Sequence, residues 1–270
     1  MSLEVTLQKA VEASQLLPSA LKNIEALLAA STNPVYRASI EELAKGGHWA
    51  ELNDRFFQAL KFGTGGLRGR TVGKIVTKAE RAGAPKSQRP TNPCVGTNAM
   101  NFYDVSRATR GLVAYVLKWR AKKKIEGRPS IVFAHDTRHF SSEFAKFCAK
   151  IATEHGVDVY LFDGPRATPE MSYAVRTLRA DAGVMLTASH NPAHDNGYKV
   201  NFSDGAGIVE PHATGIITEV NAIIGEDYKP LPKAKQGKLK KLGKEMDKSY
   251  LTRLETMMLQ PELLQDLHAK

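Results

Sequence analysis

Five consecutive segments decide the fold: SIVFAHD (130–136), SSEFAKFCAKIATEHG (141–156), VDVYLFD (157–163), TPEMSYAVRTLRA (168–180) and AGVMLTAS (182–189). The first, third and fifth are short apolar runs that end in polar residues, as buried strands do. The other two have apolar residues at helical spacing. We expect Ser141 or Ser142 to cap one helix and Thr168, followed by Pro169, to cap the other. Strands that alternate with helices predict an α/β fold, with a mostly parallel mixed sheet between two layers of helices.

The segments around this unit complete the expected organisation. Helices are expected over 4–30, over 36–60 in one or two pieces, and from 101 to about 124, whereas 207–224 predicts a short strand and a helix. YKVNF (198–202) predicts a fourth strand. The expected division is a helical N-terminal extension packing on the α/β domain (1–60), the α/β/α domain itself (61–228), a lysine-rich linker (229–248) and the beginning of a second domain (249–270).

Composition narrows the class of protein. The chain has 270 residues, 42% hydrophobic and 24% charged, which is typical of a soluble globular protein with a real core. No stretch of eighteen apolar residues predicts a membrane span, and the first residues carry Glu and Lys instead of a signal-peptide core. Cys94 and Cys148 give neither a metal spacing nor a disulfide framework. We therefore expect a cytoplasmic protein without a membrane partner.

The formal net charge is +10, and the excess is unevenly placed. Residues 229–248 contain eight lysines against Glu245 and Asp247, together with two prolines and two glycines. A basic run of this kind is most often a solvated linker or an edge segment. A nucleic-acid-binding protein is the alternative, but the run lacks the interleaved aromatic residues that stack on bases, so we expect no nucleic-acid partner.

Polar loops follow the strands at the edge where open α/β sheets bind ligands. They are AHDTR (134–138), DGPRATP (163–169) and TASHNP (187–192), and the Gly-rich GTGGLRG (63–69) could approach the same edge. Together these loops and the following strand supply Arg68, Asp136, Arg138, Arg166, Ser189, His190 and Lys199.

The residue types at this edge suit phosphate chemistry. The glycines of 63–69 would let backbone N–H groups approach an anion and Arg68 could bind a phosphate in bidentate fashion, although a tight turn explains the glycines equally well. Ser189 could act as a nucleophile or carry a phosphoryl group, with His190 as hydrogen-bond or proton donor. A desolvated Lys199 could serve as a general base. The structural alternatives are a helix cap and a turn for Ser189 and His190, and an exposed surface lysine for Lys199. The sequence has no G-x-S-x-G elbow, which disfavours the catalytic triad of a hydrolase.

Several sequence motifs, in the same order along the chain, resemble those of one known protein family. TASHNP with the following DNGYKV resembles the active-serine segment of the α-D-phosphohexomutases, the superfamily of phosphoglucomutases and phosphomannomutases. FGTGGLRG is similar to the N-terminal phosphate-binding loop of that family, and GTNAMN and AHDTR occur in the expected order. The resemblance covers about residues 40–225 and is strongest to the branch with glucose-1,6-bisphosphate-dependent mutases and phosphopentomutases.

The resemblance implies a role for each matching residue. Ser189 would be the serine that is phosphorylated, and as phosphoserine it would also be a Mg²⁺ ligand. His190 would position or protonate the substrate, Lys199 would be the general base, and Arg68 would lie near the phosphoserine. The residues implied in substrate or phosphate binding are Thr64, Gly65, Arg68, Asn191, Asp136 and Arg138, and the last two also match a D-x-R pair that supports the site in the family.

The implied activity is a phosphosugar mutase, which interconverts 1-phospho and 6-phospho (or 5-phospho) sugars through a phosphoserine and a bisphosphorylated sugar. One Mg²⁺ per site and glucose 1,6-bisphosphate, or a similar activator, are implied as cofactors, and a phosphorylated sugar as the partner. The family's D-G-D-x-D-R metal loop, E-x-S-G sugar loop and C-terminal phosphate loop have no match in this sequence. We therefore expect an N-terminal portion of a mutase with little activity alone. A non-catalytic phosphosugar-binding module is the alternative.

Overall fold

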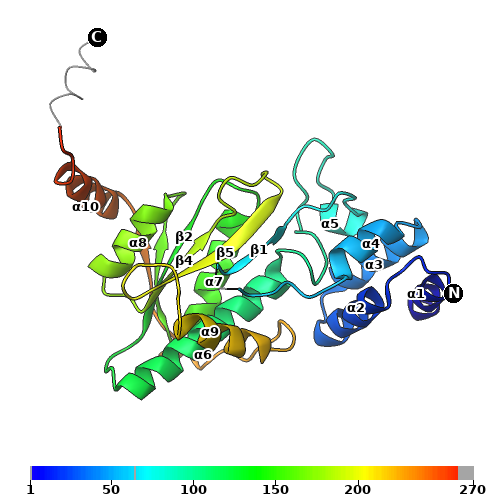
Figure 1. Cartoon of the computed structure of the whole chain (residues 1–270), viewed down its shortest axis with the longest axis horizontal. Coiled ribbons are helices and arrows are strands. Elements are labelled where there is room, and N and C mark those ends of the chain that lie inside the picture. Colours follow the sequence, from blue (N-terminus) through cyan, green and yellow to red (C-terminus); the bar gives the residue numbers. More distant parts are fainter. Residues whose placement is uncertain (1, 64, 261–270) are drawn as a thin grey trace, which may run out of the picture.

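A six-stranded mixed sheet forms the centre of the α/β part of the chain (Figure 1). The computed structural model describes residues 2–63 and 65–260. The strand order is β1-β5-β4-β2-β3-β6, with β2, β3, β4 and β6 parallel, β5 antiparallel to β4, and β1 antiparallel to β5. The strands are β1 Leu67–Arg70, β2 Ser130–His135, β3 Asp158–Phe162, β4 Ala182–Leu186, β5 Asp195–Phe202 and β6 Leu239–Leu242.

The length of each connection sets the direction of each strand. A helix lies between β2 and β3 and another between β3 and β4, long enough to return the chain for parallel pairing. Only residues 187–194 separate β4 from β5, which is too short for such a crossover, so β5 pairs antiparallel to β4. This short connection contains Ser189 and places it at the carboxyl edge of the parallel strands.

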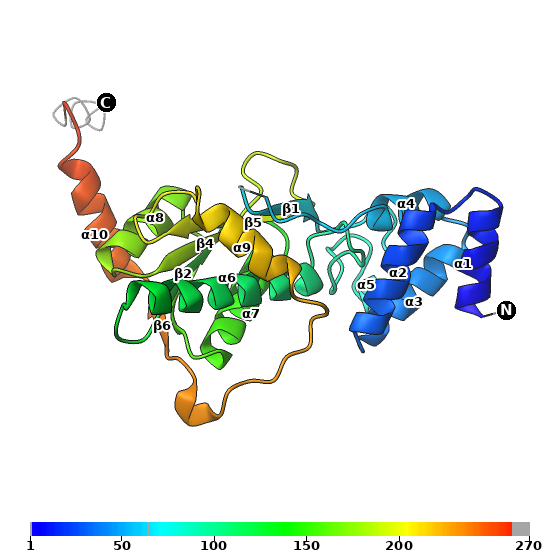
Figure 2. The same cartoon turned by 60° about the horizontal axis from the view of Figure 1, so that its bottom comes forward.

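Alternate residues of β2 face two separate cores. Ile131 and Phe133 pack on one face with α6 (Phe102–Lys123), α7 (Ser141–Glu154) and α9 (His212–Asn221). Val132 and Ala134 pack on the other face with α8 (Thr168–Thr177) and the start of α10 (Lys244–Glu255). Figure 2 shows the helices on both sides of the sheet. The expected α/β/α fold with a mixed, mostly parallel sheet is confirmed.

The N-terminal segment forms a helical part with a core of its own. Its helices are α1 Leu3–Glu12, α2 Pro18–Ala30, α3 Pro34–Lys45, α4 Trp49–Phe56 and the short α5 Lys78–Arg81. Leu7, Ile24, Ile40 and Phe56 are fully buried in this core, which also takes in Tyr103 of α6. The single helix expected over 4–30 is two helices, because the chain turns over 13–17 and Pro18 starts α2 at a helix N-terminus.

A buried ion-pair network ties the helical part together. The Arg55 side chain is 2% exposed, and its Nε lies 2.8 Å from Glu51 Oε1 and its Nη1 lies 2.5 Å from Glu80 Oε1. The same guanidinium donates to the carbonyl oxygens of Ile75 and Val95, so α4, α5 and the irregular loop between α5 and α6 all attach to one side chain.

Several local expectations differ from the structure. The N-cap of α7 is Phe140 in a left-handed conformation, because the Ser141 hydroxyl is used by Asp136, and the N-cap of α8 is Ala167, one residue before Thr168. No strand forms at 207–211. Gly207 makes only an isolated bridge to Asn201, and the helix α9 follows. The helices expected over 36–60 and from 101 to about 124 are present as α3, α4 and α6.

The lysine-rich run 229–248 contributes the outer strand of the sheet. Within it are a 3₁₀ turn (Lys233–Lys235), β6 and the first turn of α10, so a linker does not describe its second half, where the edge-segment interpretation fits. Lys240 and Lys241 are exposed on this edge strand, where charge discourages pairing with another chain. Met246 is buried on the sheet side and Tyr173 of α8 hydrogen-bonds Ser249, so the start of α10 packs on the α/β part. The expected second domain at 249–270 stays a prediction, with 261–270 outside the described residues.

Replacing Arg55 with Met should reduce the free energy of unfolding by about 3–5 kcal/mol, because Glu51 and Glu80 would stay buried without a counter-charge. Urea denaturation measures the loss. Arg37→Met is the matched control, since Arg37 pairs with Glu4 and Glu41 on the exposed surface and should change stability by less than about 1 kcal/mol. Equal effects of the two substitutions would contradict the role of the buried network.

A second prediction concerns Asp104, a fully buried carboxyl group in the first turn of α6. Burial raises its pKa to about 8, and Arg107 only partly offsets the effect. Because the folded protein then binds a proton that the unfolded chain releases near pH 4, this group's contribution to stability falls as pH rises from about 4 to 8. Asp104→Asn should therefore gain stability relative to the parent chain across this range in pH-dependent urea denaturation. A constant difference at every pH would refute this.

Candidate active site

Ser189 is exposed on the loop that leaves the carboxyl end of β4. Its backbone lies in the left-handed region with φ at 59°, a conformation that costs a non-glycine residue on the order of 1 kcal/mol. Its N–H donates to Thr187 Oγ1 at 3.0 Å, which helps to hold this conformation. The hydroxyl-bearing residue is therefore presented at the sheet edge by a fixed backbone.

The carboxylate of Asp136 accepts hydrogen bonds from several groups that support the loop of Ser189. Its Oδ1 accepts from Ser141 Oγ at 2.8 Å and from the Arg138 N–H at 3.0 Å, while its Oδ2 accepts from Thr187 Oγ1 at 2.5 Å. Asn196, completely buried, donates in turn to Ser141 Oγ at 2.9 Å. The carboxylate is thus committed to hydrogen bonds within the protein.

Arg138 binds the backbone of residues 187–195, the serine loop, by donating hydrogen bonds to carbonyl oxygens of this segment. The guanidinium donates to Ser189 O at 2.5 Å, to Pro192 O at 2.6 Å and to Asp195 O at 3.3 Å. Its Nε lies 3.1 Å from Asp136 Oδ2, and the side chain is 10% exposed. Because both groups are used in this way, their geometry fits the supporting role that the resemblance implies for this D-x-R pair, and phosphate binding by Asp136 and Arg138 stays a prediction.

Arg68 and Asn191 meet on the open side of the loop. Arg68 Nη1 lies 3.5 Å from Asn191 Oδ1, and Asn191 Nδ2 donates to Asp195 Oδ2 at 3.0 Å. His190 is exposed, and its ring makes no hydrogen bond with any described residue. The predicted residues Arg68, Ser189 and Asn191 are therefore brought together, with His190 beside them in sequence.

Lys199 lies on β5, opposite Met185 of β4, and is partly buried. Burial lowers the pKa of its ammonium group, and the positive charges of Arg68 and Arg138 lower it further against an opposing effect of Asp136. A lowered pKa increases the neutral amine fraction, which a general base requires.

The Gly-rich loop closes into a tight turn against β5. Gly63 and Gly66 exchange two backbone hydrogen bonds of 3.0 and 2.8 Å. Gly66 has φ at 88°, and a Cβ there would lie 1.8 Å from Tyr198 O. Gly65 is exposed at the turn, while Thr64 lies outside the described residues. The turn and the anion-approach interpretations of this loop are compatible, since the turn brings β1 and Arg68 to the site.

Arg166 does not join the site at this edge, contrary to the sequence prediction. Its guanidinium binds Asp247 of α10 through contacts of 2.7 and 2.9 Å and also lies 3.1 Å from Asp163. These three residues attach α10 to the loop after β3. The sequence does not single out Thr187, and it offers Ser141 only as a helix cap, because the contacts of both residues with Asp136 form only when the two loops meet.

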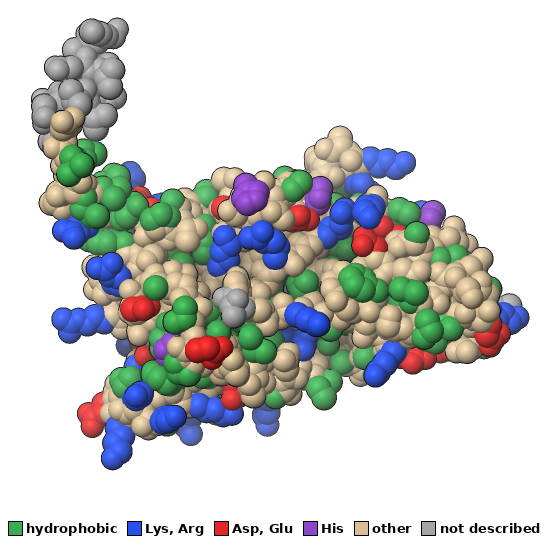
Figure 3. Space-filling view, viewed as in Figure 1, with side chains coloured by type: hydrophobic (Ala, Val, Ile, Leu, Met, Phe, Trp, Pro, Cys, Tyr) green, Lys and Arg blue, Asp and Glu red, His purple; other side chains and the backbone are tan. Residues whose placement is uncertain are grey.

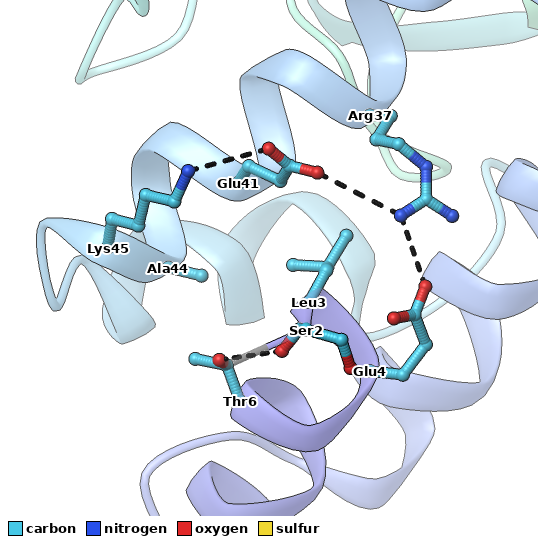
Figure 4. A pocket seen from close by; sticks show the side chains of 8 residues that line it. All are labelled: Ser2, Leu3, Glu4, Thr6, Arg37, Glu41, Ala44 and Lys45. Atoms are coloured by element: carbon cyan, nitrogen blue, oxygen red, sulfur yellow. Dashed lines mark hydrogen bonds and ion pairs between the residues drawn. The ribbon is translucent and has the colours of Figure 1, made fainter.

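The surface around the site is cationic. Figure 3 shows Lys, Arg and His side chains gathered above β5 and β1, on the face seen in Figure 1. A separate hollow of about 250 Å³ lies in the helical part between α1 and α3 (Figure 4). It contains surface ion pairs of Arg37 with Glu4 and Glu41, and none of the serine-loop residues lines it. Such exposed pairs carry little energy, so this hollow offers no comparable chemistry.

The described residues do not fit a complete Mg²⁺ site. They contain no group of three or more His, Cys, Asp and Glu side chains arranged to hold a metal. The Asp136 carboxylate is already filled by protein donors, and Asp195 bonds Asn191. Mg²⁺ prefers several oxygen ligands, which these described residues do not supply together.

Comparison with known proteins identifies the class of this fold and site. Residues 94–226 match the family model of the phosphoglucomutase/phosphomannomutase α/β/α domain I. Together with the relatives that follow, this match shows that the chain belongs to the phosphohexomutase superfamily and corresponds to its N-terminal portion.

Individual relatives agree with this assignment. The chain is 34% identical over 208 residues to a mouse phosphopentomutase, covering 75% of this chain and 29% of the relative. It is 41% identical over 127 residues to a Staphylococcus haemolyticus phosphoglucomutase, covering 47% and 22%. A solved structure from Thermus thermophilus, assigned as a phosphomannomutase, aligns with a TM-score of 0.54 and 26% identity over 74% of this chain and 36% of that one. The chain thus spans about a third or less of these relatives. Among the described residues, no helix is long and apolar enough to cross a membrane.

The turn of the Gly-rich loop generates a prediction. Gly66→Ala should reduce the unfolding free energy by at least about 1–2 kcal/mol, because it combines a left-handed backbone with a clash against Tyr198 O. Gly65→Ala is the neighbouring control, since a Cβ there meets open space and should change stability by less than about 0.5 kcal/mol. Thermal and urea unfolding measure both. A neutral Gly66→Ala would mean that this close approach does not exist in solution.

Proposed function

We propose that Ser189 carries a phosphoryl group that it exchanges with a phosphorylated sugar, as part of a phosphosugar mutase. The observation that carries the proposal is the serine loop itself: an exposed serine on a backbone fixed by Arg138 and Asp136, with Arg68 beside it. Phosphoryl transfer depends mainly on positioning and charge neutralisation, and this geometry supplies both. Membership in the phosphohexomutase superfamily and similarity to proteins named phosphoglucomutase and phosphopentomutase support it.

In the proposed transfer, Lys199 accepts one proton and His190 donates another. Ser189 Oγ bonds to phosphorus while its proton passes to the neutral amine of Lys199, and the bond between phosphorus and the sugar oxygen breaks. The departing sugar oxygen takes a proton from the imidazolium of His190. Phospho-Ser189 then transfers this group to a free hydroxyl of a sugar monophosphate, which reverses both proton transfers and forms the bisphosphorylated sugar. Ser189 takes back the other phosphoryl group of that sugar, and the two transfers together complete the exchange of position. Arg68 would neutralise the phosphate oxygens, because a guanidinium can donate two parallel hydrogen bonds to them.

A bisphosphorylated sugar, such as glucose 1,6-bisphosphate, is the proposed donor that loads the serine. Mg²⁺ dependence and a cytoplasmic location remain proposals at the level of the family. Turnover by this chain alone is expected to be low, since the described residues do not assemble the metal site. Binding of a phosphosugar without phosphoryl transfer is the competing function, favoured by the same observation.

The proposal predicts that the chain gains one phosphoryl group when incubated with glucose 1,6-bisphosphate, with and without added Mg²⁺, and that Ser189→Ala abolishes the gain. Intact-mass measurement followed by peptide mapping detects it. Ser203→Ala is the matched control, because Ser203 is an exposed serine in the turn after β5 and should leave the gain intact. A phosphoryl group on another residue would contradict the proposal. Saturable binding of the sugar without any gain would favour the binding module.

A further inference from the structure

A small polar cavity lies on the side of β1 that faces the helical part. Its volume is about 220 Å³. Its walls come from three places: the end of α4 with Leu60, the strand β1, and the loop before α6, with Asp195 at the end of the serine loop closing one side. Figure 1 shows β1 at the edge of the sheet, on the side of the helical part. The cavity therefore adjoins the serine loop without belonging to the loop itself.

Two arginines of β1 line this cavity and have no counter-charge. Arg68 and Arg70 are two residues apart on a strand, so their side chains leave the same face. Among the described residues, neither has a carboxylate oxygen within 4 Å, although Arg70 stands opposite Asp195 in the strand register. Arg68 is exposed to solvent and Arg70 is partly buried, so an anion in the cavity would compensate the charge of Arg70 more than that of Arg68.

The other charged groups around the cavity already have partners. Arg55 is neutralised by Glu51 and Glu80. Asp54 lies 3.2 Å from Lys74, and Asp195 accepts a hydrogen bond from Asn191. The five charged residues that line the cavity are three arginines and two aspartates, which sum to one positive charge, and Arg68 and Arg70 are the arginines without a carboxylate partner among the described residues.

The neighbouring Lys199 supports a positive potential in this region. Its pKa is lowered first by burial and next by the charge of Arg68. The potential is local, since Arg68 also approaches Asn191 of the serine loop. An anion entering beside Arg68 would relieve this repulsion.

The size and the donors of the cavity identify the class of ligand. Sites that enclose whole small molecules have volumes of about 300–1,000 Å³, and this cavity is smaller. It still has room for a tetrahedral anion with a few waters. Planar guanidinium groups match phosphate oxygens in bidentate geometry. Gly69 lies between the two arginines and lines the cavity through its backbone, close to Leu60.

We propose that this cavity is a phosphate subsite, in which Arg70 together with Arg68 holds a phosphoryl group of a phosphosugar that is not attached to Ser189. The inference deepens the proposed function and rests on it for the identity of the sugar. The distinctive residue is Arg70, which makes no side-chain hydrogen bond with the described residues and so has its donors available.

The test is titration of the whole chain with inorganic phosphate, glucose 1-phosphate and glucose. Calorimetry measures binding, and NMR follows the backbone amide signals of Gly69 and Ala99, which line the cavity. Both phosphates should bind and shift these signals, and glucose should not. Arg70→Met should weaken phosphate binding at least about tenfold, because hydrogen bonds to charged groups are typically worth more than one factor of ten. The phosphate affinity of Arg70→Lys, which keeps the positive charge but loses the planar guanidinium, should lie between those of the parent chain and Arg70→Met.

Arg253→Met is the matched control, since it removes an exposed arginine of α10 at the far end of the molecule and should leave phosphate binding unchanged (Figure 1). Phosphate should raise the unfolding temperature of the parent chain and not of Arg70→Met. Unchanged affinity in a folded Arg70→Met, or no phosphate binding by the parent chain, would overturn the subsite. The Ser189 mass assay fails or succeeds separately, so Arg70-dependent binding without phosphorylation would refute the proposed transfer and keep the subsite.

Discussion

The guanidinium of Arg138, held against the carboxylate of Asp136, is the contact on which the site depends. It collects three carbonyl oxygens of the serine loop, which would otherwise be difficult to satisfy in a segment that turns back on itself between two strands. Asp136 stabilises the charge of Arg138 and also accepts the Thr187 hydroxyl, so the same carboxylate fixes both sides of Ser189. A strained residue such as Ser189 persists only when its surroundings define its conformation in this way.

The sheet explains why this contact can form. Asp136 follows β2 and Ser189 follows β4, and these two strands are neighbours in parallel register, so their carboxyl ends meet. The short connection from β4 to β5 then forces the serine loop to remain at that edge. The antiparallel β1, guided by the close approach of Gly66 to Tyr198, adds Arg68 and Arg70 from the other side.

Charge distribution separates two parts of this surface. Arg138 is neutralised by Asp136 and donates its hydrogen bonds to carbonyl oxygens, whereas Arg68 and Arg70 of β1 are left without carboxylate partners among the described residues. The first arrangement builds a rigid loop, and the second leaves positive charge beside it for an anionic ligand. A site that exchanges phosphoryl groups requires both properties, since positioning and charge stabilisation contribute together.

The sequence by itself determined the alternation of strands and helices, the polar loops after β2 and β4, and the motif around Ser189, because these depend on residue periodicity and on short local patterns. It did not reveal that Arg166 would bind Asp247, 81 residues away, and it left open whether the lysine run is a linker or an edge segment, which the pairing of β6 with β3 decides for residues 239–242. It also did not indicate that Thr187 would bind Asp136, 51 residues away, or that Ser141 would bind Asn196, 55 residues away. Only tertiary structure decides such contacts, because strand pairing and side-chain hydrogen bonds between distant segments leave no periodic trace in the chain.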